Sequence, residues 1–216
     1  MANSLAAPSV RAVLDRLHAA ADHDGERGPT GIDFATATAA ERADALAEVY
    51  MPISAEAGAL LYALVRSARP DTVVEFGTSF GISTLYLAAA VADNGRGRVL
   101  TTELSAAKVA AARADLAAAG LDGHVTVLAG DALRTLADVP GPIGLLLLDG
   151  WKDLYLPVLH GLRDRLAPGA LVLADDTSFE SVRPYLEHVR DPANGYVGVD
   201  FPVEDGMEIS CWTGAG

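Results

Sequence analysis

Acidic and basic side chains follow two apolar segments that have the length of buried strands. Residues 145–148 are four leucines, and Asp149 and Lys152 come directly after them. A second apolar segment ends in Asp175 and Asp176. In an open α/β sheet, ligands bind beyond the carboxyl ends of the strands, so these side chains are expected to meet at one edge. Three carboxylates and a lysine there predict a divalent-metal site with a base beside it.

The order of the remaining elements predicts the scaffold that positions these groups. Apolar spacing predicts a helix over 5–21, a polar loop or mobile cover over 22–38, and helical segments over 39–50 and 55–67. From residue 71 onward, strands and helices alternate, which is typical of a mostly parallel sheet with right-handed crossovers. The predicted strands are 73–76, 98–102, 125–128, 143–148 and 170–174. The helices predicted between them are 82–92, 106–119, 132–137 and 155–166. Segments 195–201 and 207–212 predict a closing β-hairpin at one sheet edge.

Length and charge restrict the class of protein. A chain of 216 residues suits one α/β domain with a large core. A formal net charge of −13 argues against nucleic acid as a partner, because phosphate binding requires clustered Lys and Arg. No apolar run approaches the roughly 20 residues that a membrane span requires, and the first residues lack the pattern of a signal peptide. We therefore expect a cytoplasmic protein with no membrane partner. The single cysteine, Cys211, is interpreted as a buried small side chain.

Three consecutive predicted strands end in groups that suit a nucleoside. Gly77 and Gly81 allow a tight turn and close ligand approach before a helix, although Ser79 occupies the middle position of a G-x-G-x-x-G pattern. Glu103 lies at the end of the second strand, where an acid accepts hydrogen bonds from ribose in such folds. Asp131, at the end of the third strand, is placed to reach an adenine amino group. The alternative for both acids is N-capping of the helices that follow.

Two nucleoside ligands compete for this predicted pocket. A dinucleotide requires a loop that seats a pyrophosphate, and the negative charge of Glu75 at the strand end opposes that. The same charge suits the ammonium group of S-adenosylmethionine (SAM), a cationic ligand that an acidic cleft attracts. The sequence thus favours a methyltransferase over a nicotinamide oxidoreductase.

From about residue 51 to 212 the chain resembles the class I SAM-dependent methyltransferases, and among them the catechol O-methyltransferases and bacterial small-molecule O-methyltransferases. The segment Leu-Asp-Gly-Trp-Lys-Asp-Leu-Tyr-Leu-Pro at 148–157 carries the resemblance most specifically. It implies a Rossmann-like α/β fold: a mostly parallel seven-stranded sheet with a C-terminal antiparallel hairpin. One domain over 1–216 is expected, with an N-terminal helical cap over 1–50 and a catalytic core over 51–216.

The resemblance also implies roles for individual residues. Asp149, Asp175 and Asp176 are the implied ligands of Mg²⁺ or another divalent cation such as Mn²⁺ or Ca²⁺. Lys152 is the implied base that takes the proton from the attacking hydroxyl, and Trp151 lines the adenosine pocket. The residues expected to contact the cofactor are Met51, Ile53, Glu75, Gly77, Ser79, Gly81, Ser83, Glu103, Asp131, Ala132, Asp149 and Trp151. The expected acceptor is a phenolic or natural-product small molecule with vicinal hydroxyls.

The chain departs from the family pattern at several positions. Asp176 stands in place of the usual asparagine, and Gly150 replaces a histidine of the animal enzymes, which would open space near the cofactor. The glutamate that holds the second catechol hydroxyl in those enzymes aligns with Val199 and Asp200, so Asp200 is the candidate substitute. Four aromatic residues are candidate walls of the acceptor site, with core packing as the alternative: Phe179, Tyr196, Phe201 and Trp212.

Alternatives to this interpretation remain open. A metal-independent methyltransferase of the same fold, a non-catalytic SAM-binding protein and a nicotinamide oxidoreductase are each compatible with part of the pattern. Lys152 could instead pair with Asp153 or Glu180 at the surface. The N-terminal helices are interpreted as a lid or as a contact in a homodimer.

Overall fold

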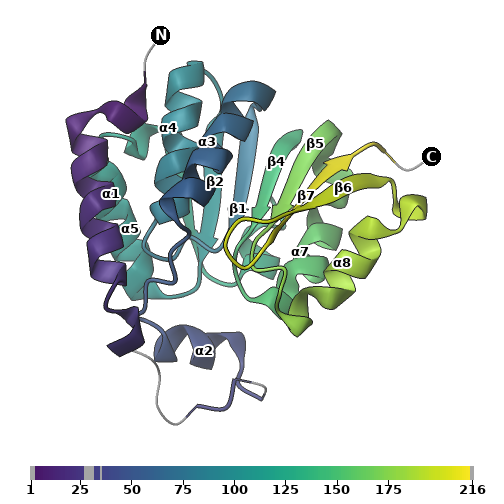
Figure 1. Ribbon diagram of the computed structural model, residues 1–216, viewed down its shortest axis with the longest axis horizontal. Coiled ribbons are helices and arrows are strands. Elements are labelled where there is room, and N and C mark those ends of the chain that lie inside the picture. The colour runs from purple at the N-terminus through teal and green to yellow at the C-terminus, as the bar shows by residue number, and fades with distance from the viewer. Residues whose placement is uncertain (1–2, 27–31, 35, 215–216) are drawn as a thin grey trace.

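The protein is built around one mixed sheet of seven strands, as the computed structural model shows for residues 3–26, 32–34 and 36–214 (Figure 1). The strand order is β3-β2-β1-β4-β5-β7-β6. The strands β1 to β5 pair in parallel, β7 pairs antiparallel to β5, and β6 pairs antiparallel to β7. Their bounds are β1 Thr72–Phe76, β2 Arg98–Glu103, β3 Val125–Ala129, β4 Ile143–Leu148, β5 Leu166–Ala174, β6 Tyr196–Phe201 and β7 Met207–Trp212. The predicted parallel sheet with a C-terminal hairpin is confirmed.

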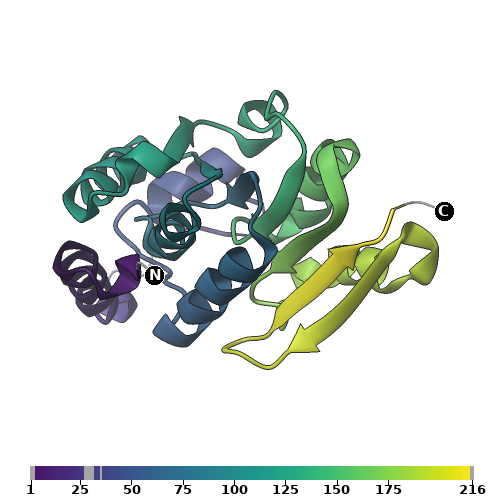
Figure 2. The same cartoon turned by 90° about the horizontal axis from the view of Figure 1, so that it is seen from above.

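Helices cover both faces of the sheet, which gives the three layers seen from above in Figure 2. The α-helices are α1 Pro8–Ala21, α2 Ala39–Ala45, α3 Ala55–Ala68, α4 Ile82–Asn94, α5 Ala106–Ala119, α6 Ala132–Thr135, α7 Tyr155–Leu162 and α8 Arg183–Arg190. One core lies between the sheet and the layer of α1, α3, α4 and α5. A second core lies between the sheet and α6, α7 and α8.

Successive residues of the central strands face opposite cores. Leu145 and Leu147 of β4 belong to the core under α3 and α4, whereas Leu146 and Leu148 belong to the core under α7 and α8. All four leucines are fully buried. A strand that is covered on both faces reads as a continuous apolar run rather than an alternating one. This explains why the four consecutive leucines form a strand, and it fixes where the polar residues after them begin.

Several helical segments differ from the prediction. The α2 helix ends at Ala45 instead of residue 50, and α7 ends at Leu162 instead of 166, because Leu166 is already the first residue of β5. The α8 helix was not predicted, since Tyr185 and Val189 are its only buried residues and the rest of it is mostly polar. The predicted loop over 22–38 contains a short 3₁₀ helix at Asp24–Glu26, and its residues 27–31 and 35 lie outside the described part of the chain.

The N-terminal region has two parts. The α1 helix packs against α5 and α4, and its Val10 and Leu17 are buried in the main core. The α2 helix lies apart from the other helices, below the sheet in Figure 1, at the edge where the parallel strands end. A role of this region as a lid or dimer contact stays a prediction. Within the described residues, none of the helices combines the length and apolar composition that a membrane span needs.

Candidate active site

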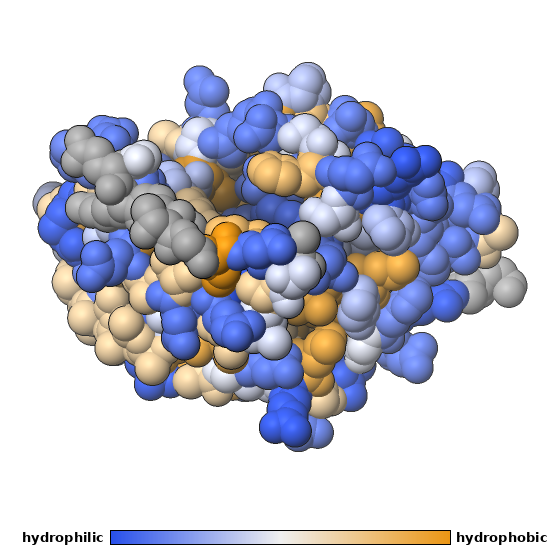
Figure 3. All heavy atoms as spheres, turned by 90° about the horizontal axis from the view of Figure 1, so that it is seen from below, coloured by the Kyte–Doolittle hydropathy of each residue, from blue (hydrophilic) through white to orange (hydrophobic). Residues whose placement is uncertain are grey.

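A cavity of 820 Å³ opens at the carboxyl ends of the parallel strands. Figure 3 shows this face as a hollow with hydrophobic side chains along its rim. Its walls come from the loops after β1, β2, β3, β4 and β5, and α2 with the segment before α3 closes the remaining side. The cavity therefore lies at the topological switch point between β1 and β4, where open α/β sheets bind their ligands.

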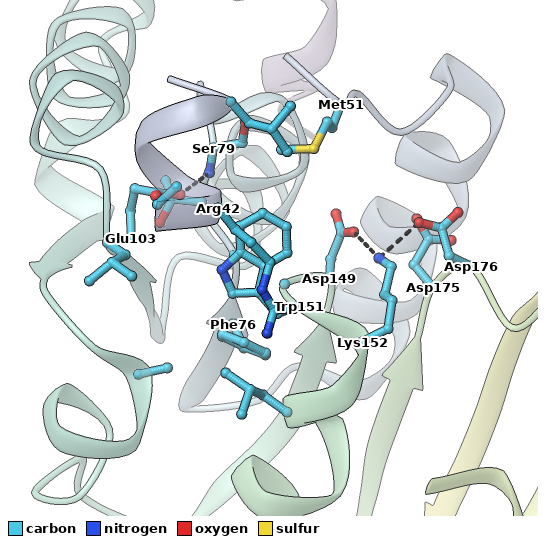
Figure 4. Close-up of a pocket in the computed structure, with 18 of the residues that line it drawn as sticks. Arg42, Met51, Phe76, Ser79, Glu103, Asp149, Trp151, Lys152, Asp175 and Asp176 are labelled. Carbon is cyan, nitrogen blue, oxygen red and sulfur yellow. Dashed lines mark hydrogen bonds and ion pairs between the residues drawn. The ribbon is translucent and has the colours of Figure 1, made fainter. Parts of the chain in front are cut away.

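Three aspartates and a lysine meet on one side of this cavity. One carboxylate oxygen from each of Asp149, Asp175 and Asp176 lies within 4.8 Å of the others. Lys152 lies between them: its Nζ is 2.8 Å from Asp176 Oδ2 and 3.5 Å from Asp149 Oδ1. Figure 4 shows the lysine pointing into this group from the loop after β4. The sequence prediction that two strand ends bring these four residues together agrees with this geometry.

Backbone contacts between neighbouring strand ends hold the aspartates in position. The Asp149 amide donates to Phe76 O at 2.9 Å, and the Asp175 amide donates to Leu148 O at 3.0 Å. Gly77 makes the first contact possible, because a Cβ there would lie 2.4 Å from Asp149 O. Its φ of +104° is also one that L side chains rarely adopt. Gly77 is therefore required for the close approach of the β1 and β4 loops.

Burial and mutual repulsion set the charge state of this group. Burial raises the pKa of Asp149 well above its usual value, and the neighbouring carboxylates of Asp175 and Asp176 add to the effect, against the attraction of Lys152. Burial and the charge of Asp176 raise the pKa of Asp175 to about 6. Burial alone would lower the pKa of Lys152, but Asp149 and Asp176 outweigh it, so the net pKa is raised. Asp149 and Asp175 therefore retain their protons more readily than free aspartates do, and Lys152 stays protonated.

Tyr155 fixes the position of Lys152 from the first turn of α7. Its hydroxyl accepts a hydrogen bond from Lys152 Nζ at 2.8 Å and donates to Asp175 O at 3.3 Å. The surface pairing considered for Lys152 is not formed, because Asp153 pairs with Arg42 and Glu180 pairs with Arg183. Lys152 instead points into the cavity.

The opposite side of the cavity carries the groups predicted to bind a nucleoside. Both oxygens of Glu103 are fixed by backbone amides: Oε2 accepts from Ser79 N at 2.9 Å and Oε1 accepts from Ser105 N at 2.8 Å. The Asp131 side chain accepts from Leu133 N at 2.9 Å and so caps α6. Capping and a ligand contact are compatible, since Asp131 also lines the cavity.

Most of the residues expected to contact a cofactor line the cavity, and two do not. Those that line it are Met51, Ile53, Gly77, Ser79, Ser83, Glu103, Asp131, Ala132, Asp149 and Trp151. Glu75 is fully buried behind the wall, where its carboxylate accepts a hydrogen bond from Thr84 Oγ1. Gly81 faces Ala112 of α5. Glu75 and Gly81 therefore do not line the cavity, and their expected contacts with a cofactor stay predictions.

Two basic residues of the cavity were not predicted from the sequence. Arg42 of α2 forms a two-pronged ion pair with Asp153, and its guanidinium lies 5.2 Å from the centre of the Trp151 ring. Lys108 of α5 is 3% exposed and lines the cavity near Glu103. Both residues come from helices, and only the tertiary packing decides that they point toward the site. Polar residues on amphipathic helices usually face solvent, so the sequence contains no signal for them.

The cavity has an apolar rim. Phe34, Met51 and Phe179 line it and are among the exposed large hydrophobic residues. Glu204, in the loop between β6 and β7, also lines it and accepts a hydrogen bond from Ser54 N.

Of the candidate aromatic walls, Phe179 is therefore at the site. Tyr196 and Trp212 pack in the core under α8, and Phe201 is exposed at the end of β6 and does not line the cavity. Asp200 accepts a hydrogen bond from Thr177 Oγ1 and does not line the cavity. The space expected beside Gly150 is filled by the Phe76 ring, 2.5 Å from where a Cβ would lie.

Comparisons with known proteins agree with this arrangement. A family model described as a methyltransferase domain matches residues 74–177. The protein named "Probable O-methyltransferase Rv1703c" of Mycobacterium tuberculosis is 34% identical over 146 residues, which cover 62% of this chain and 61% of that protein. Pig (Sus scrofa) catechol O-methyltransferase is 30% identical over 148 residues, which cover 65% of this chain and 78% of that protein.

A solved structure shares the fold. The O-methyltransferase TomG of Streptomyces achromogenes, solved in complex with SAM, has a TM-score of 0.69 and 23% sequence identity, and the match covers 93% of this chain and 99% of that one. The chain spans less than two thirds of the mycobacterial relative and more than three quarters of the pig enzyme.

Proposed function

The chain belongs to the O-methyltransferase family that includes the catechol O-methyltransferases, and from this premise we propose that it transfers a methyl group from SAM to one hydroxyl of a small aromatic vicinal diol, with a divalent cation at the aspartates. The observation that supports this most directly is the meeting of Asp149, Asp175 and Asp176 around Lys152 inside the cavity. A metal site and a proton acceptor then lie side by side, as methyl transfer to a chelating diol requires.

The donor set fits a hard divalent cation. Asp149, Asp175 and Asp176 offer only oxygen ligands, which suit Mg²⁺, and Mn²⁺ or Ca²⁺ accept the same donors. Asp175 is 4% exposed, and its Oδ1 has no hydrogen-bond partner among the described residues. A buried carboxylate oxygen without a partner is costly unless a ligand satisfies it. This orphaned oxygen supports a cation rather than a purely structural cluster.

Lys152 is the proposed base for the acceptor hydroxyl. Its Nζ is held at the aspartates by Tyr155, so an acceptor oxygen delivered there meets a fixed proton acceptor. Without a bound cation, the surrounding carboxylates keep the amine protonated, because they raise the pKa of Lys152. A cation bound by the three aspartates would offset this charge and act as a Lewis acid toward the acceptor oxygen. With its own proton released to solvent, the free amine of Lys152 would then receive the hydroxyl proton.

The cofactor side fits SAM in shape and charge. Glu103 is the proposed acceptor for the ribose hydroxyls, because backbone amides already hold both of its oxygens in place. Trp151 and Asp131 border the region proposed for the adenine. When bound, SAM supplies the electrophilic methyl group. The apolar rim formed by Phe34 and Phe179 supports an aromatic small molecule as the acceptor.

The proposal is tested by methyl transfer from SAM to a panel of catechols, with Mg²⁺ and then with excess EDTA. We expect product that disappears with EDTA and returns with Mg²⁺. Product that is insensitive to EDTA would instead support the metal-independent alternative. The Lys152→Met variant should lose at least about 100-fold in kcat, the scale of general-base catalysis. It should still bind the product S-adenosylhomocysteine (SAH) with nearly unchanged affinity by calorimetry. Full turnover in this variant would contradict the assignment of the base.

A further inference from the structure

The chain contains two lysines, Lys108 and Lys152, among 16 basic residues, and both line the same cavity. Lys152 belongs to the aspartate group. Lys108 lies in the first turn of α5, near Glu103. Nothing in the proposed chemistry uses Lys108, although its position in the wall of the cavity is unusual for a lysine, a residue that is almost never fully buried unless it is paired.

Lys108 is buried with most of its hydrogen-bonding capacity unused. It is 3% exposed, and within the described part of the chain its Nζ forms no ion pair. Its hydrogen-bond acceptor there is Ser79 Oγ at 3.2 Å. The Phe80 ring centre lies 5.4 Å from Nζ and adds a cation–π contact. An ammonium group carries three N–H donors, so about two remain without an acceptor. A buried donor without a partner costs free energy unless a ligand supplies the acceptor.

Ser79 connects Lys108 to the wall and sets the direction of its bond. The Ser79 hydroxyl donates to Tyr50 O at 2.7 Å, so its oxygen is left as an acceptor for Lys108. The Ser79 amide in turn donates to Glu103. Lys108 and Glu103 are thus held around one loop residue and bring opposite charges to the same part of the cavity. Burial lowers the pKa of Lys108, and the carboxylates of Glu103 and Asp24 oppose that shift.

We propose that Lys108 is a cofactor-binding residue whose ammonium group donates hydrogen bonds to the ribose hydroxyl oxygens of SAM, while Glu103 accepts from the hydroxyl hydrogens. This rests on the proposed function in that the cavity must bind SAM. A hydroxyl both donates and accepts, so a neighbouring carboxylate and ammonium satisfy both capacities at once. A carboxylate of the cofactor at the same place would be repelled by Glu103, and for this reason the ribose diol is the preferred partner.

The first test is a thermodynamic cycle between residue and ligand, measured by titration calorimetry. The Lys108→Met substitution removes the charge and keeps most of the side-chain length. SAH should bind this variant about 10- to 100-fold more weakly, the effect of losing hydrogen bonds to a charged donor. For an SAH analogue that lacks the 2′ and 3′ hydroxyls, the affinities of the wild type and of Lys108→Met should agree within about twofold. Arg113→Met is the matched control, because it removes a positive charge from the same helix at a side chain that bonds to Val127 O. It should leave SAH affinity unchanged.

The second test needs no substitution. Periodate-oxidised SAH carries aldehydes at the 2′ and 3′ carbons. A nearby lysine amine condenses with one aldehyde to form an imine and release water, and cyanoborohydride then delivers hydride to the imine carbon. Peptide mapping by mass spectrometry should find the label on Lys108, and excess unmodified SAH should prevent it.

The outcomes separate this inference from the proposed function. Equal loss of affinity for SAH and its dideoxy analogue in Lys108→Met would overturn the ribose contact, as would labelling confined to Lys152 or to the amino terminus. Unchanged SAH affinity in Lys108→Met would overturn any cofactor role for Lys108 and leave the SAM-binding cavity in place. Failure of the wild type to bind SAH would refute both.

Discussion

Arg42 links α2 to the loop after β4. Its Nη1 and Nη2 each lie 3.0 Å from one oxygen of Asp153, and its guanidinium stacks over Trp151. The helix has seven residues and lies apart from the other helices, so it has little packing of its own (Figure 1). We therefore expect Arg42→Met to increase local opening of α2 while leaving the sheet intact.

The size of this effect follows from the exposure of the partners. The Arg42 side chain is 17% exposed and that of Asp153 is 48% exposed, so solvent screens the pair and it contributes about 0.5–1 kcal/mol. The cation–π contact with Trp151 adds about 0.5–1 kcal/mol. A total of about 1–2 kcal/mol corresponds to about 5- to 30-fold more frequent opening. Asp153→Asn removes only the ion pair, so α2 should open about 2- to 5-fold more often in this variant than in the wild type.

Hydrogen–deuterium exchange of peptides that cover α2 measures this opening directly. Arg183→Met is the matched control, because it removes an exposed arginine that pairs with Glu180 and Glu187 rather than with a residue near α2. It should not change exchange in α2. Exchange of α2 that stays at the wild-type rate in Arg42→Met would refute the reasoning. It would show that apolar contacts, rather than Arg42, hold the helix.

Three other predictions test the scaffold and the metal group. Gly77→Ala should lower the free energy of unfolding by about 1–3 kcal/mol, because the new Cβ would strain the backbone and contact Asp149 O. Urea denaturation measures this loss. Gly161→Ala is the control: a Cβ there meets nothing within 4 Å, so this variant should be as stable as the wild type or more stable. Burial lowers the pKa of His188, so its contribution to stability is complete above about pH 6.5, the unfolded value, and is lost as the pH falls toward the folded value. His188→Gln should therefore flatten the urea midpoint between about pH 7 and 5 relative to wild type, and identical slopes would contradict the burial effect. Asp176→Asn should bind Mn²⁺ about tenfold more weakly by calorimetry, since ligand charge tunes affinity, and unchanged affinity would show that the negative charge of Asp176 does not contribute to metal binding.

The sequence predicts the sheet well because its strands are set by local apolar runs. The β4 strand is a run of buried leucines, so both its position and the polar residues after it are visible in the sequence. The α8 helix was missed for the opposite reason: only Tyr185 and Val189 are buried, and a short polar segment with Pro184 resembles a loop. The end of α7 was misplaced, because a 3₁₀ helix over Arg163–Arg165 continues the helical pattern up to Leu166, where β5 begins.

The residues of the site also fall into two groups, those that the sequence predicts and those that it does not. Asp149 and Asp175 follow strands directly and Lys152 lies in the same loop as Asp149, so the register of the sheet places them and the sequence suffices. Glu75 lies within a strand, and whether it reaches the cavity depends on the direction of its side chain, which points into the interior. The positions of Lys108 and Arg42 depend on how their helices pack against the rest of the molecule. The sequence pattern does not predict how deeply these side chains are buried.

The strand order also has a consequence for synthesis of the chain. On a ribosome, β1, β2 and β3 emerge before β4, and they pair with one another in the finished sheet. Until residues 143–148 have left the exit tunnel, the second edge of β1 has no partner. An unpaired edge of a buried strand is a template for wrong pairing between nascent chains. The half of the molecule that carries Glu103 would thus be prone to wrong pairing during synthesis. The half that carries the three aspartates would end this exposure once β4 pairs with β1.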